Sequence, residues 1–404
     1  MKRLFLDPTP AAVEILVASG LFALPVSKAA AEVFLISALA CWLLHKFATR
    51  TSPLPASPVT WIYSAFLAIS LASFIQIPAA LRPEGLMGIL KWLKYLGIFF
   101  MCLDLYAVPQ KRSRLFWILI LSLVIVSIDG FWQLYTGRDL FFGYKLDPGR
   151  IVRMKASLTA ANLLAGFLLF ALPLSALACY RSRRWVRGLT GASFFLFLAA
   201  FFLTYSRGAF YAMALSLFLN LLLLRKIKIA LAVTLFSILL VFSVPSFRYN
   251  FVKTLKKNDI TIAERRDYWS VAFNMIKREP LLGVGLNTYH ARFPDFTPDP
   301  GVRRAYPHNS YLQMASEIGI PGALCFLGGI LYLLGLSFKK NFVRNDPEAF
   351  ALRTALIAFL IQGFFDNNFY ALQTATLFWV FGGVFSGLTL ATQNGTGRSS
   401  SASP

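Results

Sequence analysis

Long, uninterrupted apolar segments restrict the fold of this chain more than any other feature. Hydrophobic residues make up 57% of its 404 residues and charged residues only 14%, so few charges interrupt the runs. A run of about 20 apolar residues can cross a bilayer as a helix, and a helix satisfies its own backbone hydrogen bonds there. Because the runs do not alternate as barrel strands do, the sequence predicts an all-α polytopic membrane protein.

Twelve segments are long and apolar enough to be candidate spans. They lie near 10–27, 29–48, 58–78, 86–106, 115–136, 158–179, 187–206, 208–224, 228–245, 319–337, 349–367 and 370–391. We therefore expect a transmembrane bundle of about nine helices over 1–245, an extramembrane loop with amphipathic helices over 246–318, and three further spans over 319–391. The Gly/Ser-rich residues 392–404 are expected to form a disordered cytoplasmic tail.

Lysine and arginine are concentrated in alternate short loops, which predicts the orientation of the chain. Lys46, Lys111 and Arg184 represent the basic set, whereas the opposite short loops hold little more than Lys28 and Arg82. By the positive-inside rule, the basic loops and both termini are cytoplasmic, and 137–157 and 246–318 lie outside. The net charge of +22 is thus explained by topology and contact with anionic membrane lipid, and no nucleic-acid partner is expected.

The loop over 246–318 contains two predicted helices, and the first presents arginines. Thr261 and Glu264 form a capping box that predicts a helix start, and the helix is expected to run to about Lys277. At helical spacing Arg265 shares an apolar face with Trp269, while Arg266 lies on a more polar face. A charge on an apolar face needs an anionic partner, so Arg265 is the stronger candidate and Arg266 the weaker.

The second predicted helix follows Pro307, a residue favoured at the first helical position, and ends at Gly319. His308 would then lie in the first turn, where the helix dipole disfavours imidazolium. A neutral histidine can accept a proton, so we predict that His308 is a general base. A structural histidine bonded to backbone is the alternative.

Ionisable residues near the outer ends of spans are further candidates. Arg207 precedes Gly208, which would let a substrate approach closely. Lys91 and Lys94 share a helix face and would either receive a phosphate or pair with Asp104 or Asp129; the sequence does not decide between these. Asp366 is expected to cap the eleventh span.

The motifs that hold metals or nucleotides are missing from this sequence. The four cysteines lie inside apolar runs, and no convergent carboxylates of the kind that Mg²⁺ prefers are found. No metal and no cofactor are therefore expected. Convergent arginines suit a phosphate-rich ligand and can stabilise a pyrophosphate leaving group. In a membrane this chemistry, with a histidine base, fits attack by a sugar hydroxyl on a lipid-pyrophosphate-linked sugar.

Several of these elements together resemble the bacterial O-antigen ligase and polymerase family. They are Ser206-Arg207-Gly208, Arg265 with Trp269, Pro280-Leu281-Leu282-Gly283-Val284-Gly285-Leu286-Asn287, His308-Asn309-Ser310-Tyr311-Leu312-Gln313, and Glu317-Ile318-Gly319-Ile320 with Pro321-Gly322. A Gly-x-x-x-x-Pro-Asn stretch common in the family is reduced here to Asn162.

The resemblance implies a GT-C-like helical enzyme of the bacterial inner membrane. Such ligases transfer O-antigen polysaccharide from undecaprenyl pyrophosphate to a lipid A core sugar on the periplasmic face, without metal. By position, Arg207 and Arg265 would bind the donor pyrophosphate, with Arg266, Lys91 and Lys94 as further candidates. His308 would activate or orient the acceptor hydroxyl.

Other functions use similar features. An O-antigen polymerase or a protein O-oligosaccharyltransferase would use the same donor. A transporter or flippase would carry charges through the midplane and show internal repeats; Glu32, Asp104 and Asp129 keep it open, but the amphipathic loop argues against it.

Overall fold

The structure, a computed structural model, describes residues 11–147, 152–243, 245, 248–249, 260–297, 299, 301–339 and 344–395. Its main helices are α1 (Ala11–Ala23), α2 (Lys28–Ala48), α3 (Pro58–Ala72), α4 (Arg82–Leu105), α5 (Pro109–Thr136), α6 (Ala161–Arg181), α7 (Arg184–Leu203), α8 (Arg207–Leu223), α9 (Ile227–Ser243), α11 (Ile260–Arg278), α12 (Tyr289–Phe296), α13 (Ser310–Lys339), α15 (Pro347–Gln362) and α16 (Leu372–Gly395). Two short 3₁₀ helices, η1 (Ser73–Gln76) and η2 (Ala79–Leu81), join α3 to α4.

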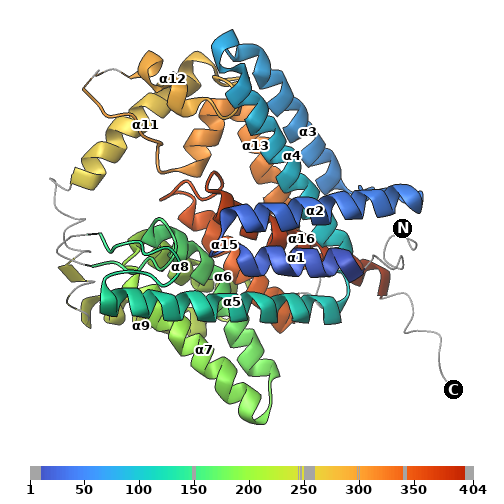
Figure 1. Cartoon of the computed structure of the whole chain (residues 1–404), viewed down its shortest axis with the longest axis vertical. Coiled ribbons are helices and arrows are strands. Elements are labelled where there is room, and N and C mark those ends of the chain that lie inside the picture. Colours follow the sequence, from blue (N-terminus) through green and yellow to red (C-terminus); the bar gives the residue numbers. More distant parts are fainter. Residues whose placement is uncertain are drawn as a thin grey trace.

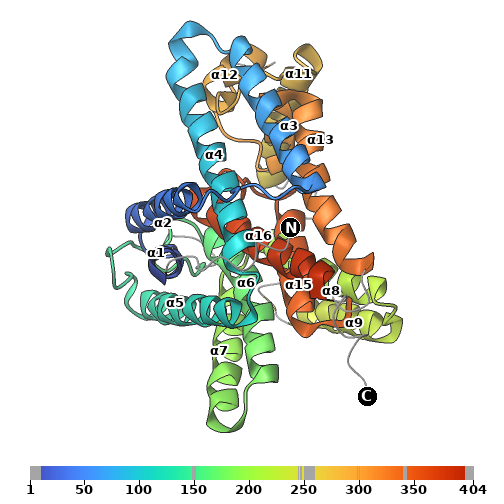
Figure 2. The ribbon, with the colours of Figure 1, turned by 90° about the vertical axis from the view of Figure 1, so that its right-hand side faces the viewer.

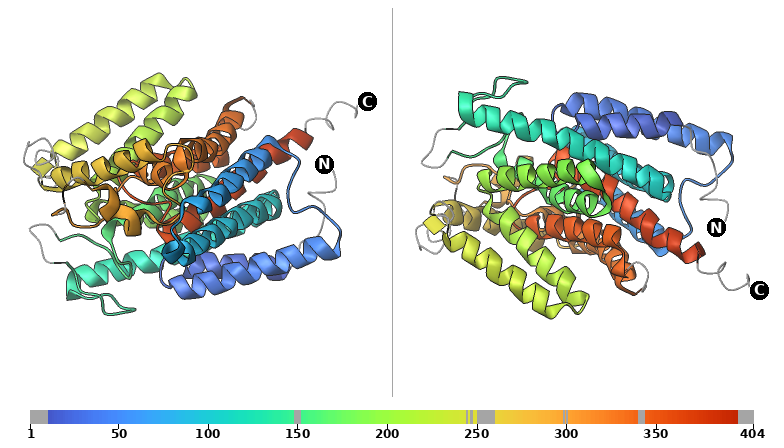
Figure 3. Two further views of the ribbon diagram at one scale, coloured as in Figure 1. Left: turned by 90° about the horizontal axis from the view of Figure 1, so that it is seen from above. Right: turned by 90° about the horizontal axis from the view of Figure 1, so that it is seen from below.

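Each of the twelve predicted spans coincides with a helix, and the described residues form no strand. Among the described residues, seven helical segments are long and apolar enough to cross a membrane, and α1, α8 and α9 add shorter apolar helices. The prediction of an all-α, multi-pass membrane protein is confirmed. The helix α1 begins and α16 ends on the same side of the molecule (Figures 1 and 3).

The helix α16 lies at the centre of the bundle. It packs against α4, α6, α13 and α15, and α15 in turn packs against α6 and α8. Trp379 of α16 is fully buried and meets Tyr63, Trp92 and Phe99 edge-on. Such edge-to-face aromatic contacts add to the burial energy of each ring, so they fix α3 and α4 against the centre.

The helices α11 and α12 lie beside the first turns of α13, at the end of the molecule where α3 meets α4 (Figures 1 and 2). A small second core of buried residues joins them, and it includes Val271, Met275, Val284, Tyr289 and Phe293. Because this core is separate from the core of the bundle, α11 and α12 pack into a layer in which their polar residues have defined positions.

A glycine-rich seam joins this layer to α13. The Val284 N–H donates to the Ser316 carbonyl at 2.8 Å, and the Gly285 N–H donates to the Glu317 carbonyl at 3.0 Å. Gly283 has a φ of +68°, and a Cβ added there would collide with the Glu317 backbone. The Gly283-Val284-Gly285 stretch therefore serves close contact between two chain segments.

One end of the first segment of α13 differs from the prediction and the other agrees with it. The first turn of α13 starts at Ser310, and the Asn309 side chain caps it by accepting from the Tyr311 and Leu312 N–H groups at 3.0 and 3.1 Å. The prediction that Pro307 starts the helix was wrong, because Asn309 is the stronger N-cap. The predicted stop at Gly319 is confirmed by its non-helical backbone (φ +72°).

The α11 helix covers the predicted range, but the Thr261 side chain lies outside the described residues, so the capping box stays a prediction. The α12 helix was missed, because it is short and contains Pro294. The helix α16 continues to Gly395, past Thr392 where a disordered tail was expected to begin, and residues 396–404 lie outside the described residues.

Candidate functional site

A polar cavity of about 560 Å³ lies between α8, α11 and the loops that precede α6, α13 and α16. Three of the predicted arginines and the predicted histidine line it, although they come from distant parts of the chain. Its lining residues are Arg153, Asn162, Tyr205, Ser206, Arg207, Gly208, Tyr211, Glu264, Arg265, Arg266, Tyr268, Trp269, His308, Gln362, Phe365 and Asp366.

Arg207 reaches the cavity because a tight turn separates α7 from α8. Tyr205 adopts a positive φ of 47°, and the Ser206 carbonyl accepts from the Phe210 N–H at 3.0 Å, so Arg207 is the first residue of α8. A Cβ at Gly208 would lie 2.8 Å from the Cβ of Phe365. Gly208 therefore makes room for Phe365, which lines the same cavity, and Gly208 also lines it; its role in admitting a substrate stays a prediction.

Arg265 and Trp269 face the cavity from α11, as the helix phase predicted. The Arg265 guanidinium donates to the Phe365 carbonyl at 3.0 Å, and the Trp269 indole N–H donates to the Pro307 carbonyl at 2.8 Å. These bonds tie α11 to the loop that carries His308 and to the α15–α16 loop. Arg266 is more exposed and also lines the cavity, so the arginines remain in reach of one ligand.

His308 lies in the loop before α13, with a left-handed backbone (φ +46°). Its Nδ1 is 3.6 Å from Oδ1 of Asp366, and 46% of the histidine side chain is exposed. The expectation that His308 lies in the first turn of α13 was wrong, because the helix begins two residues later, at Ser310. The Asp366 carboxylate faces Nδ1, so it can orient the imidazole ring.

Asp366 lies in the loop between α15 and α16, where several donors hold its carboxylate. Asn162 Nδ2 donates to Oδ2 at 2.9 Å, and the Asn367 N–H donates to Oδ1 at 2.8 Å. Burial raises the pKa of this carboxyl, but the His308 imidazole and the Asn367 N–H outweigh burial, so the pKa of Asp366 lies below its ordinary value. Asp366 is therefore an ionised partner for His308 at neutral pH.

Arg153 extends this set of polar contacts. Its guanidinium donates to the Thr204 carbonyl at 2.8 Å and to Oδ1 of Asn162 at 2.7 Å. Burial and the neighbouring Arg207 charge lower the pKa of Arg153. Two arginines that repel each other in one cavity are stabilised by a bound anion, which the fork of each guanidinium can bind through two hydrogen bonds.

Lys91 and Lys94 do not lie at this cavity, so the structure separates them from the arginines. Lys94 Nζ pairs with the Glu32 carboxylate at 2.6 Å, and Lys91 Nζ donates to the Tyr370 carbonyl at 2.8 Å. Neither lysine pairs with Asp104, whose carboxylate is 2.8 Å from Lys46 Nζ. The assignment of both lysines to the same anion site as Arg207 and Arg265 was wrong.

The composition of the cavity bears on which ligands it can hold. Among the described residues, no group of three or more His, Cys, Asp and Glu side chains is placed to hold a metal ion. The ionisable groups that line the cavity include four arginines, Glu264, Asp366 and His308. This arrangement can bind a multiply charged anion beside a carboxylate-oriented histidine.

Sequence reasoning missed the role of Asp366, which was expected only to cap a span. Asn162 was noticed in the sequence but given no role, and Arg153 was not proposed as a site residue. A signal was present, because Asp366-Asn367-Asn368 interrupts an apolar stretch with three polar residues. Pairing it with His308 needed the fold, since the Ser310 N–H bonds the Gly363 carbonyl at 2.8 Å and Ser310 Oγ bonds the Asp366 carbonyl at 2.9 Å.

Comparison with known proteins agrees with the motifs found in the sequence. The family model described as O-antigen ligase matches residues 192–327, about a third of the chain. The matched segment includes Arg207, Arg265, Arg266 and His308. None of the curated proteins matches this sequence.

Proposed function

We propose that this chain, a protein of the O-antigen ligase family, transfers O-antigen polysaccharide from undecaprenyl pyrophosphate to a sugar hydroxyl of the lipid A core. One observation carries the proposal: Arg207, Arg265, Arg266 and His308, from three separate segments, line one cavity. The proposed setting is the bacterial inner membrane, with the loop over 246–318 and the cavity on the periplasmic face.

The arginines are proposed to bind the donor pyrophosphate. Guanidinium groups match phosphate oxygens bidentately and remain charged at all relevant pH values. Arg207 and Arg265 flank the cavity from α8 and α11, and Arg153 and Arg266 add positive charge at its edges. Negative charge increases on the bridging oxygen as the glycosidic bond to the pyrophosphate breaks, so fixed positive charges stabilise the transition state more than the ground state.

His308 is proposed to take the proton of the acceptor hydroxyl. With its Nδ1–H directed at Asp366, its Nε2 is left as the acceptor. The hydroxyl oxygen forms a bond to the anomeric carbon, the bond from that carbon to the pyrophosphate oxygen breaks, and undecaprenyl pyrophosphate leaves. The hydroxyl proton moves to Nε2, and Asp366 stabilises the resulting imidazolium.

A transfer assay with purified protein, lipid-pyrophosphate-linked polysaccharide and lipid A core tests the proposal. We expect polysaccharide on lipid A core, and equal rates with and without EDTA. Longer lipid-linked polymer in place of that product would favour an O-antigen polymerase. Polysaccharide on a protein serine or threonine would favour a protein O-oligosaccharyltransferase. Loss of activity in EDTA would contradict the metal-independent mechanism.

Two variants test the residue roles. His308→Ala should abolish transfer and retain donor binding, and normal transfer by this variant would contradict the base assignment. Arg265→Ala should weaken donor binding by roughly 2–5 kcal/mol, the usual effect of removing one member of a buried charge pair. Lys277→Ala, an exposed cation on the same helix away from the cavity, is the matched control and should bind donor normally.

A further inference from the structure

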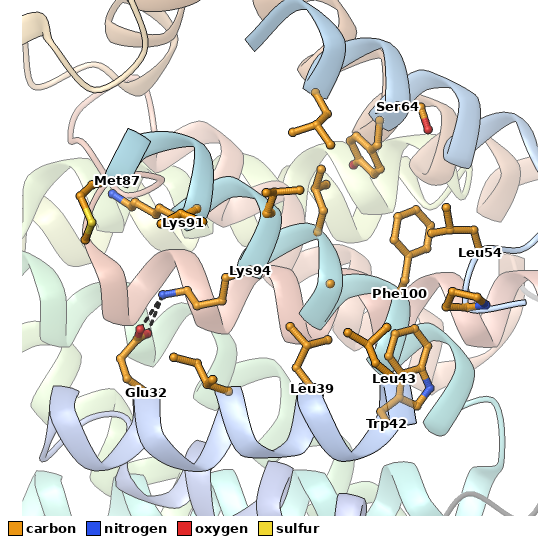
Figure 4. A pocket seen from close by; sticks show the side chains of 18 of the residues that line it. Glu32, Leu39, Trp42, Leu43, Leu54, Ser64, Met87, Lys91, Lys94 and Phe100 are labelled. Carbon is orange, nitrogen blue, oxygen red and sulfur yellow. Dashed lines mark hydrogen bonds and ion pairs between the residues drawn. The ribbon is translucent and has the colours of Figure 1, made fainter. Parts of the chain in front are cut away.

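A second, larger hollow lies on another face of the bundle, between α2, α3 and α4 (Figure 4). Its volume is about 920 Å³, and it shares no lining residue with the arginine cavity. Apolar side chains line most of it, among them Leu39, Leu43, Leu54, Leu90 and Phe100. Exposed apolar surface is common on a membrane-spanning helix, but here the surface is concave. An acyl chain bound in it would be surrounded by protein on several sides.

The polar groups of this groove gather at one end. Figure 4 shows Lys91, Lys94 and Glu32 together, with the apolar side chains of Leu39, Leu43 and Leu54 extending away from them. Lys94 and Glu32 form an ion pair at 2.6 Å, so Lys91 leaves the lining with a net positive charge. Glu317 also attracts Lys91 electrostatically, but it lies in the protein interior and does not line the groove.

The protein holds the Lys91 ammonium in place and leaves some of its hydrogen-bond donors unused. Its ammonium donates to the Tyr370 carbonyl at 2.8 Å and lies 5.4 Å from the centre of the Tyr370 ring. An ammonium has three N–H donors, so two remain for a ligand. None of the ion pairs formed by the described residues includes Lys91. Glu317 attracts Lys91 without forming an ion pair with it, so a phosphate would supply a direct anionic partner for this charge inside a membrane protein.

The dimensions of the groove fit one leaflet of a bilayer. Glu32 and Leu43 both line it and lie about three turns apart on α2, a distance of about 17 Å. Half of the hydrocarbon core of a membrane is about 15 Å thick. Tyr370, the partner of Lys91, belongs to the loop that also carries Phe365 and Asp366, so the charged end lies at the same end of the bundle as the arginine cavity.

We propose that this groove binds an anionic diacyl phospholipid from the leaflet on the side of the arginine cavity. The lipid phosphate contacts Lys91 beside the Lys94–Glu32 pair, and the acyl chains lie along α2 and α4 toward Leu43 and Leu54. The net positive lining selects an anionic over a zwitterionic headgroup. This lipid site does not depend on the proposed transferase activity.

Native mass spectrometry of the full-length protein tests the proposal, with phosphatidylglycerol and phosphatidylcholine of identical acyl chains supplied in competition. The wild type should retain phosphatidylglycerol about tenfold more than phosphatidylcholine, equivalent to about 1.4 kcal/mol. Lys91→Gln should lose this preference. Lys28→Gln, an exposed lysine at the start of α2 outside the groove, should keep it. Equal retention of both lipids by the wild type, or an unchanged preference in Lys91→Gln, would overturn the proposal.

A second pair of variants tests the path of the acyl chains. Ile36 lines the groove and is 50% exposed, so Ile36→Trp fills the groove without disturbing the core. It should lower retention of both lipids at least threefold. Val33→Trp, at a position on α2 that is 64% exposed and outside the groove, should leave retention unchanged. Equal retention by the two variants would place the acyl chains elsewhere.

Discussion

Replacing Asp366 by asparagine tests the coupling between its carboxylate and His308. The Asp366→Asn side chain keeps the shape and one acceptor oxygen but removes the negative charge 3.6 Å from His308 Nδ1. At an effective dielectric of about 20, unit charges at this separation attract by roughly 4–5 kcal/mol. Because 46% of the histidine side chain is exposed, solvent screening reduces the expected effect to about 2 kcal/mol.

A loss of about 2 kcal/mol of transition-state stabilisation lowers the rate about 30-fold. We therefore expect Asp366→Asn to lower kcat about 30-fold, with little change in donor binding because the arginines remain. The assay is single-turnover transfer of lipid-linked polysaccharide to lipid A core. Asp267→Asn removes a similar charge from exposed α11, outside the cavity, and should leave kcat unchanged. Wild-type kcat in Asp366→Asn would refute the reasoning.

The same substitution changes the pH dependence of stability. The folded-state pKa of Asp366 is lowered, so its ionised form stabilises the folded state fully above the unfolded value of about 3.9. That stabilisation disappears as the pH falls through the folded-state pKa. Near neutral pH, the free energy of unfolding of Asp366→Asn should therefore differ from that of the wild type by an amount that does not change with pH. In acid the two free energies of unfolding should converge.

Two further variants test the seam and the bundle. Gly283→Ala should lower the free energy of unfolding by roughly 1–3 kcal/mol, because the residue has a positive φ and its Cβ would meet the Glu317 backbone. Gly137→Ala, at a positive φ with open space around it, should lower the free energy of unfolding by less. Equal thermal shifts of the two variants would contradict the clash at Gly283. Glu348→Gln should cost roughly 3–5 kcal/mol, because it leaves Arg112, its buried partner, without a carboxylate. Thermal unfolding in detergent measures both, and an unshifted Glu348→Gln would show that the ion pair does not stabilise the bundle.

Much of the architecture follows from the sequence, because apolar length and helix phase are local properties. The helices at the twelve apolar segments, the orientation of Arg265 with Trp269 and the break at Gly319 all depend on residues within a few turns of one another. The start of α13 was misplaced because two local signals compete there, and the capping side chain of Asn309 outweighed the proline preference at Pro307.

The site itself was only partly predictable. Arg207, Arg265 and His308 were chosen one at a time for their chemistry, and the fold then brought them together. The partner of His308 was not found, because Asp366 belongs to a different loop and reads locally as a helix cap. Lys91 and Lys94 were assigned to the arginine site because their side chains suit phosphate, but α4 places them in another groove. Residue type therefore does not identify a site residue unless its position in the fold is also known.

The boundaries of the arginine cavity also bear on how such proteins diversify. The segment recognisable as O-antigen ligase ends at residue 327 and begins at 192, whereas Arg153, Asn162 and Asp366 complete the cavity from either side of it. A chimera that exchanges only the recognisable segment would inherit the arginines and the histidine with a foreign carboxylate. The residues that line this cavity therefore span a longer part of the chain than the segment that the family model matches. A graft meant to keep the cavity intact should extend from the loop before α6 to the loop after α15.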